Sequence, residues 1–407
     1  MKNRPFTSRR EFLRLASSGL AGAALFSSGA CSPQSKEKSE KRRRFVHRTL
    51  GRTGLRLPVV SMGSSYAIDL VRRALDEGIV YIHTSSDYAD GNHERLLGEV
   101  LSGRPRDSFV VATSPDLPYP YSIELDRSSD IGKGANPQRI VESAEESLRR
   151  LGLEYVDIYY LTSVGSRHVA LHQPYLDAFH KLKRDGKTRF VGIGTHEHEP
   201  EVIRAAVESG FWEVVLTAHN FRQSHREEVR AAIRQAAEAG LGVVAMKTQA
   251  GVYWDRSRAK KINMKAALKW VLENENVHTT IPAFSTYEEM QEDLSIMEDL
   301  ALTAEEKRDL GLGEELGLSG FYCDQCGRCL AQCPAEMNIP ALMRSHMYAF
   351  GHRQPKKARD TLRSWTPEDI ACRTCGSCLV ECARGFDVKS RVLDIARILH
   401  VPAEFLG

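Results

Sequence analysis

Several features are missing from this sequence, and each absence removes a class of protein. The formal net charge of the 407 residues is only +3, so no strongly basic face is expected and nucleic acid is not an expected partner. The apolar run from Leu15 to Ala30 is too short and too rich in small residues to span a membrane. The near-balanced charge and ordinary apolar content are typical of a globular protein of about two or three domains.

Cysteine is scarce over most of the chain and concentrated at its end. Eight of the nine cysteines form two C-terminal blocks of identical spacing: Cys323, Cys326, Cys329 and Cys333, then Cys372, Cys375, Cys378 and Cys382. Three thiolates at two-residue gaps can hold one face of a cubane, while the fourth serves the other cluster. The pattern predicts two 4Fe-4S clusters and a role in electron transfer.

Zinc and disulfides are the alternative interpretations of these cysteines. Structural zinc prefers two separated pairs of ligands, which these blocks do not provide. A disulfide framework normally stabilises a short domain with a small core, whereas this chain is long enough to bury large cores. Both alternatives fit the duplicated blocks less well than iron–sulfur clusters do.

The N-terminus indicates export. Ser8 to Arg14 contains the pair Arg9-Arg10 and precedes the weakly apolar run, a pattern typical of a twin-arginine signal peptide over residues 1–31. This route resembles the one used by proteins that fold around a cofactor before crossing a membrane. We therefore expect a periplasmic protein, or one on the outer face of the cytoplasmic membrane. The alternative is a basic amphipathic start that stays in the cytosol.

The ninth cysteine, Cys31, follows the apolar run and resembles a lipoprotein acylation site, although Ser28 stands where leucine is usual. Membrane anchoring through a lipid on Cys31 and simple cleavage near Ala30 are both open. Residues 32–46 form a polar linker without apolar periodicity, and its basic end could rest on anionic headgroups.

Short apolar runs and amphipathic helical patterns alternate between the linker and the cysteine blocks. We expect strands at 57–62, 79–83, 109–113, 157–161, 190–194, 214–219, 242–247 and 278–282. Helices are expected at 67–77, 137–151, 175–185, 200–209, 226–239 and 264–273. Eight strands, most of them followed by a helix, predict an α/β fold, a (β/α)8 TIM barrel over residues 47–312. An open doubly wound sheet is the alternative, but no Gly-rich dinucleotide fingerprint follows the first strand.

Several segments of this region resemble the aldo/keto reductases in order and spacing. They are Leu50 to Leu55, Ala74 to Gly78, Tyr88 with Glu94 to Gly98, Ser147 to Gly152 with Tyr155 to Tyr159, and Ile281-Pro282 with Glu288. The resemblance runs from about Thr49 to Leu312. One branch of that family also carries C-terminal iron–sulfur motifs, and this chain is similar to it.

The resemblance implies a carbonyl reductase site, but most of its residues differ here. The family uses a tyrosine acid with an aspartate, a lysine and a histidine at successive strand ends. Tyr88 matches the tyrosine, whereas the other positions hold His83, Ser114 and Thr162. A phenol with a pKa near 10 needs a nearby cation to act as an acid at neutral pH. We therefore expect a degenerate site, with Tyr88 and His83 as its candidate catalytic residues.

The positions that hold the nicotinamide cofactor in the family have changed as well. They carry Gly194-Thr195, Leu216 and Met246, and Ala283 to Thr286 lacks the basic residue that grips a 2′-phosphate. NADP(H) binding in the usual way is therefore not expected.

Other polar residues are predicted at the C-terminal strand ends, where TIM barrels place their sites. Besides His83, the sequence puts His196, His198, His219 and Lys247 there. Such a group could bind a small-molecule substrate, a metal or a redox-active compound, or act as general bases. The alternative is a set of ordinary surface or hydrogen-bonded histidines.

Residues 313–407 are predicted to form a small α-helical ferredoxin-like domain with helices at 341–350, 355–365 and 388–399. By likeness to dicluster ferredoxins, one cluster would take Cys323, Cys326, Cys329 and Cys382. The other would take Cys372, Cys375, Cys378 and Cys333.

These features predict an exported iron–sulfur oxidoreductase that receives or delivers electrons through a redox partner protein or a membrane electron-transfer complex. In one alternative the barrel is catalytically silent and serves as a docking scaffold within such a complex. In another, the chain is an NAD(P)H-dependent aldo/keto reductase with an atypical site.

Overall fold

The computed structural model describes residues 45–115, 136–251, 253–254, 259–315, 323, 326–351, 355–362, 365–402 and 405–406. The predicted signal peptide, Cys31 and all but the last two residues of the predicted linker lie outside these ranges. All the described residues belong to one compact unit that spans the barrel and the C-terminal cysteines. None of the helices in these ranges is long and apolar enough to cross a membrane.

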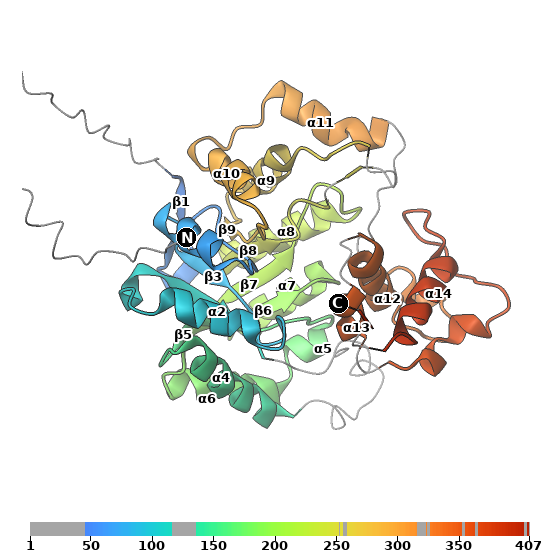
Figure 1. The fold of residues 1–407 in the computed structure, drawn as a ribbon, viewed down its shortest axis with the longest axis horizontal. Helices are drawn as coiled ribbons and strands as arrows, with labels where there is room; N and C mark the ends of the chain where they lie inside the picture. The colour runs from blue at the N-terminus through green and yellow to red at the C-terminus, as the bar shows by residue number, and fades with distance from the viewer. Residues whose placement is uncertain are drawn as a thin grey trace, which may run out of the picture. The chain divides into compact units, whose positions relative to one another are not determined.

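Seven parallel strands form a sheet in the order of the sequence (Figure 1). They are β3 (Tyr81–His83), β4 (Val110–Thr113), β5 (Val156–Leu161), β6 (Thr188–Thr195), β7 (Val214–Ala218), β8 (Gly242–Met246) and β9 (Thr279–Thr280). The segment after Pro58 closes the sheet into a barrel, because Val60 bridges Thr280 of β9 and Met62 bridges Ile82 of β3. The predicted (β/α)8 barrel is thereby confirmed.

The first predicted strand, 57–62, is divided between two sheets. Its start belongs to β2 (Arg56–Pro58), which pairs antiparallel with β1 (His47–Thr49) in a hairpin that the sequence analysis missed. Only the segment that follows joins the barrel. A short hairpin gives no alternation long enough to be recognised as two strands.

Helices follow the strands around the barrel (Figure 1). They are α1 (Ile68–Asp76), α2 (Asn92–Leu101), α4 (Pro137–Leu151), α5 (Arg167–Ala170), α6 (Gln173–Arg184), α7 (Glu199–Ser209), α8 (Arg226–Glu238), α9 (Met264–Leu272), α10 (Tyr287–Ser295) and α11 (Ala304–Glu315). The start of α4 shows why they form: the Asn136 side chain accepts a hydrogen bond from the Gln138 amide, and Pro137 occupies the first turn. The predicted domain boundary at 312/313 falls inside α11.

Two apolar layers fill the barrel region. One lies between the sheet and the helices and includes Val111, Ile193 and Val243. The other fills the barrel interior and includes Tyr81 and Tyr160, whose hydroxyl oxygens are 3.1 Å apart. These layers hold the strand ends in fixed positions, as a close-packed core does.

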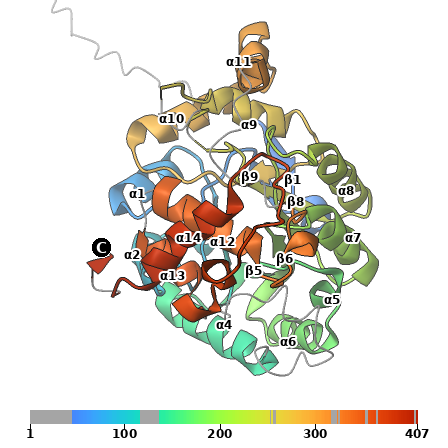
Figure 2. The same ribbon diagram turned by 90° about the vertical axis from the view of Figure 1, so that its right-hand side faces the viewer.

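The C-terminal module consists of α12 (Ile339–His346), a π-helical turn η7 (Met347–Gly351), α13 (Pro355–Thr361) and α14 (Val388–Leu399) (Figure 2). Its core contains Ile339, Leu342 and Val392, with Cys372 buried among such residues. The helix predicted at 341–350 begins two residues earlier and changes to π geometry at Met347. The helix predicted at 388–399 agrees with α14.

Candidate functional site

The structure gathers the cysteines into two sets drawn from both blocks, a first set around Cys329 and a second set around Cys372. Burial raises the pKa of the Cys329 thiol to about 12, and the thiols of Cys326, Cys382 and Cys333 lie close enough to contribute. Burial also raises the pKa of Cys372, with contributions from Cys333, Cys378 and Cys375. A set of buried thiols can persist as thiolates only beside a compensating positive charge such as iron.

The second set surrounds a volume rather than a point. Cys333, Cys372, Cys375 and Cys378 line a small pocket together with apolar side chains that include Met337, Ile339 and Val380. The iron atoms at the corners of a cubane are ligated by separate thiolates, so four cysteines around one apolar pocket fit a 4Fe-4S cluster.

The first set lies next to the barrel. Gly327, between Cys326 and Cys329, has φ +72°, and a Cβ there would be 2.7 Å from Cε1 of His198. His198 stands at the start of α7 with φ 51°, itself a left-handed conformation. Only a glycine allows the cysteine loop to approach this imidazole so closely.

The carboxyl ends of the strands bring His83, His196 and Lys247 together. Burial lowers the pKa of His83 to about 3, and His93 and Lys247 lower it further. Burial also holds the pKa of His196 well below its usual value, with contributions from Arg344, Lys247, His83 and Lys357. Nε2 of His83 and Nδ1 of His196 are buried, and neither atom has a hydrogen-bond partner among the residues that the structure describes. Both imidazoles are therefore neutral at physiological pH, and each has a ring nitrogen free to bind a ligand.

The structure does not bring His219 into this group. Its ring packs on Trp270 of α9 at 5.1 Å between centroids. Burial lowers its pKa to about 3, and the charged side chain that contributes most is Arg230 on α8. The side chain thus faces the helical layer, because the strand alternation at the end of β7 points it outward.

The tyrosine position of the family lacks its usual surroundings. Burial raises the pKa of Tyr88 well above 10, and Asp87 raises it further. Ser114, at the lysine position, hydrogen-bonds Ser85 with 2.6 Å between the hydroxyl oxygens. A cation comes instead from the C-terminal module, where Nζ of Lys357 lies 5.6 Å from the centre of the Tyr88 ring.

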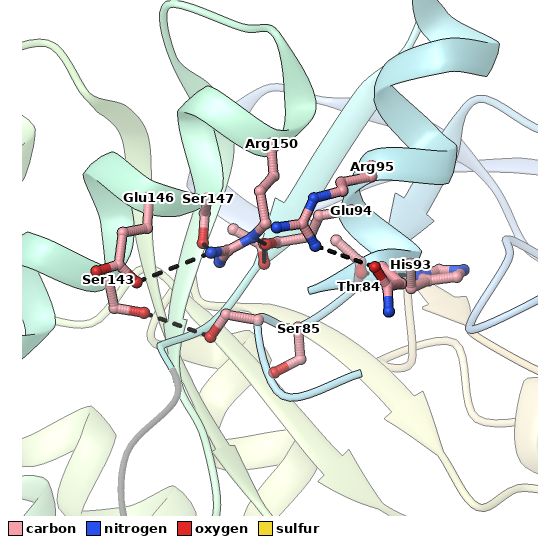
Figure 3. A network of polar contacts seen from close by, with 12 residues as sticks. Thr84, Ser85, His93, Glu94, Arg95, Ser143, Glu146, Ser147 and Arg150 are labelled. Carbon is pink, nitrogen blue, oxygen red and sulfur yellow. Dashed lines mark hydrogen bonds and ion pairs between the residues drawn. The ribbon is translucent and has the colours of Figure 1, made fainter. Parts of the chain in front are cut away.

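A buried polar network holds the loop that carries Tyr88 (Figure 3). Oε2 of Glu94 accepts a hydrogen bond from Nε of Arg150 at 2.6 Å, and Oε1 accepts one from Thr113 at 2.6 Å. Beside it, Nδ1 of His93 is 2.7 Å from the Thr84 hydroxyl. The network ties α2 to β4 and α4 and so fixes the start of the helix that follows the Tyr88 loop.

The C-terminal module contributes side chains that the sequence analysis did not include in the site. Arg344 of α12 lies 3.9 Å from Glu197, and both side chains are buried. Lys356 of α13 lies 3.6 Å from Asp90, in the loop after β3. Tyr348 of η7 lies with its ring 6.0 Å from Nζ of Lys247 and 4.7 Å from Nζ of Lys357. The amphipathic pattern predicted a helix here but gave no sign that its far side meets the barrel.

The start of α10 carries acidic residues. By the family resemblance, this is the position where a basic residue binds the 2′-phosphate of the cofactor. Thr286 caps the helix, and Oε2 of Glu289 accepts a hydrogen bond from the Ser285 amide at 2.7 Å. Asp293 is 2% exposed, and burial holds its pKa well above the usual value. The Glu289 carboxylate thus accepts the hydrogen bond of the Ser285 amide, which would otherwise be available to an anion such as phosphate.

The fold and the cysteine sets define an oxidoreductase barrel joined to an iron–sulfur domain. Residues 50–265, just over half of the chain, match the model of the aldo/keto reductase family, and residues 322–386 match that of the 4Fe-4S dicluster domain. The chain belongs to the aldo/keto reductase family and carries a 4Fe-4S dicluster domain.

Individual relatives are similar over the barrel. L-galactose dehydrogenase of Arabidopsis thaliana is 26% identical over 62% of this chain and 88% of its own length. An aldo-keto reductase of Bacillus halodurans in its holo form is 24% identical, with a TM-score of 0.53, over 66% of this chain and 96% of that one. The aldo-keto reductase of Klebsiella pneumoniae, solved with NADPH, is 21% identical with a TM-score of 0.50 over 66% and 95%. These structures establish the fold, and the NADPH complex gives no support to our expectation that NADP(H) is not bound.

Proposed function

We propose that this chain is an exported iron–sulfur oxidoreductase whose barrel exchanges electrons with two 4Fe-4S clusters instead of a nicotinamide. The observation that carries the proposal is the contact of Gly327 with His198, which sets the first cysteine set against the barrel. When bound, the clusters would supply one electron at a time. Cys323, Cys326, Cys329 and Cys382 would hold the cluster beside the barrel, and Cys333, Cys372, Cys375 and Cys378 the other.

The second cysteine set has one exposed member, Cys378, and this suits contact with a redox partner. The neighbouring Leu379 is 66% exposed. An exposed leucine beside a cluster ligand gives a partner protein an apolar contact close to the iron. Electrons would pass between the partner and this cluster, and then through the first cluster to the barrel.

Loss of nicotinamide binding is the second part of the proposal. Ser114 supplies no cation to Tyr88, and Glu289 places a carboxylate at the start of α10. Phosphate binding needs a basic residue or free amides at such a helix start. NADPH binding by a solved relative favours the alternative, an NAD(P)H-dependent reductase with an atypical site.

Export and anchoring complete the proposal. The paired Arg9 and Arg10 support the twin-arginine route to the periplasm or the outer face of the cytoplasmic membrane, and Cys31 supports a lipid anchor. A barrel that acts only as a docking scaffold in an electron-transfer complex remains a second candidate, favoured by Ser114 and Thr162 at two family positions.

An anaerobic titration of the cluster-loaded protein tests the electron route. NADPH and NADH are added first, then dithionite, while visible absorbance and electron paramagnetic resonance follow the clusters. We expect no bleaching with either nicotinamide and full reduction by dithionite. Bleaching by NADPH would refute the proposal in favour of the nicotinamide-dependent alternative. Cys375→Ser should alter the resonance of one cluster and leave that of the other unchanged. The altered resonance is then assigned to the second cysteine set.

A further inference from the structure

We propose that Tyr348, supplied by the C-terminal module, is the acid–base residue of the barrel mouth, acting on a carbonyl compound that the barrel binds there. This inference rests on the proposed function, because the reaction draws its electrons from the clusters. It replaces Tyr88 in that role by a tyrosine from a different domain.

The placement of Tyr348 is the first support. It lies in the π-helical turn η7, which directly continues α12. The buried Arg344–Glu197 pair holds α12 on the loop after β6. Insertions of π geometry in helices are frequent at functional sites, because they redirect a side chain. Here the turn places the Tyr348 ring near two ammonium groups, 6.0 Å from Nζ of Lys247 in the barrel and 4.7 Å from Nζ of Lys357 in α13.

Lys247 is positioned at an energetic cost. Its φ of 57° is left-handed, a backbone conformation that non-glycine residues rarely adopt because it is strained. Its ammonium lies 6.0 Å from the centre of the Tyr348 ring. Strained backbone at the end of a barrel strand, aimed at one phenol, is typical of a residue held for function rather than for stability.

The charges around Tyr348 make it a usable acid. Burial alone would raise its pKa, but Lys247, Lys357 and Arg344 outweigh burial and lower it to about 8, against a smaller opposing effect of Asp87. Tyr88 also faces this group, and the neighbouring His196 is neutral. Near pH 7 about nine tenths of such a phenol carries its proton, so it can donate and be reprotonated readily.

The reaction balances with components named here. Reduction of a carbonyl to an alcohol consumes two electrons and two protons. An external protein donor would provide both electrons, and the clusters held by the eight cysteines would pass them on one at a time. The carbonyl oxygen takes its proton from the O–H of Tyr348, and the carbon takes one from water. The phenolate left behind is reprotonated from solvent, which reaches the exposed Lys247 and the half-buried Tyr348.

Tyrosine ionisation measured on the cluster-loaded protein tests the site without any substrate. In ultraviolet difference spectra we expect one tyrosinate to appear near pH 8 in the wild type and to disappear in Tyr348→Phe. Tyr88→Phe should retain it. Lys357→Met should move the transition to higher pH, whereas Lys356→Met, on the same helix but paired with Asp90, should leave it in place. Circular dichroism and cluster absorbance show that each variant is folded and loaded. A transition near pH 8 that survives in Tyr348→Phe would overturn the proposal.

Turnover tests the catalytic role. Reduced methyl viologen serves as electron donor, and methylglyoxal, benzaldehyde or phenylpyruvate as acceptor. We expect wild-type turnover with at least one acceptor and a loss of roughly 10²- to 10⁴-fold in kcat for Tyr348→Phe. Equal rates in the variant, or no turnover with any of the three by a protein whose clusters reduce normally, would overturn the inference. Failure of the clusters to reduce would instead refute the proposed function, so the two failures are distinguishable.

Discussion

Replacing Arg150 by methionine should destabilise the barrel markedly. The carboxylate of Glu94 is fully buried, and its ion pair with Arg150 has an N–O distance of 2.6 Å. Breaking a buried ion pair by removing one partner costs about 3–5 kcal/mol. The Thr113 hydroxyl still donates to Glu94, so we expect the lower end, about 3 kcal/mol. At a urea slope of about 3 kcal/mol per M, the midpoint of unfolding falls by about 1 M.

Urea unfolding followed by circular dichroism measures this effect, and two variants control it. Arg149→Met changes the neighbouring exposed arginine and should stay within about 0.5 kcal/mol of the wild type. Glu94→Gln combined with Arg150→Met removes both charges and should recover part of the loss, because an amide oxygen still accepts from Thr113. If Arg150→Met unfolds at the same midpoint as Arg149→Met, the network does not stabilise the barrel as we infer.

Three further changes probe other contacts. Gly98→Ala places a Cβ 2.7 Å from the carbonyl oxygen of Arg150. This overpacking should lower the free energy of unfolding by about 1–3 kcal/mol, measured by thermal unfolding. An unchanged melting temperature would contradict it. Gly327→Ala pushes the cysteine loop away from His198, so electron paramagnetic resonance should show one altered cluster. A wild-type spectrum would mean that this contact does not position the first cysteine set. Removing iron with a chelator should make the C-terminal module more sensitive to limited proteolysis than the barrel, because thiolate–iron bonds stabilise that module. Equal protection of the module with and without iron would refute this.

The barrel was predictable because its signals are local. Eight apolar runs separated by amphipathic helices gave the fold class, and most helix bounds agreed within two residues. The motifs behind the family resemblance also meet in space: Glu94 from one and Arg150 from another form the buried ion pair. Periodicity and caps record such local choices directly in the sequence.

The candidate site was predictable only in part, because it is assembled across domains. Strand ends placed His83, His196 and Lys247 together as expected. His219 was expected with them, but the alternation of side chains along β7 points it outward, toward Trp270. Nothing in the sequence pattern showed that Tyr348 would reach the barrel, since contacts between distant segments leave no periodic signal.

Tyr348 and Lys357 reach the barrel from the segment that carries the cluster cysteines. If this segment folds only with its iron, as we expect, a chain without clusters would lack both its electron path and its proposed acid. Iron loading would then control both functions together, so the proposed acid would reach the barrel only in protein that can also receive electrons.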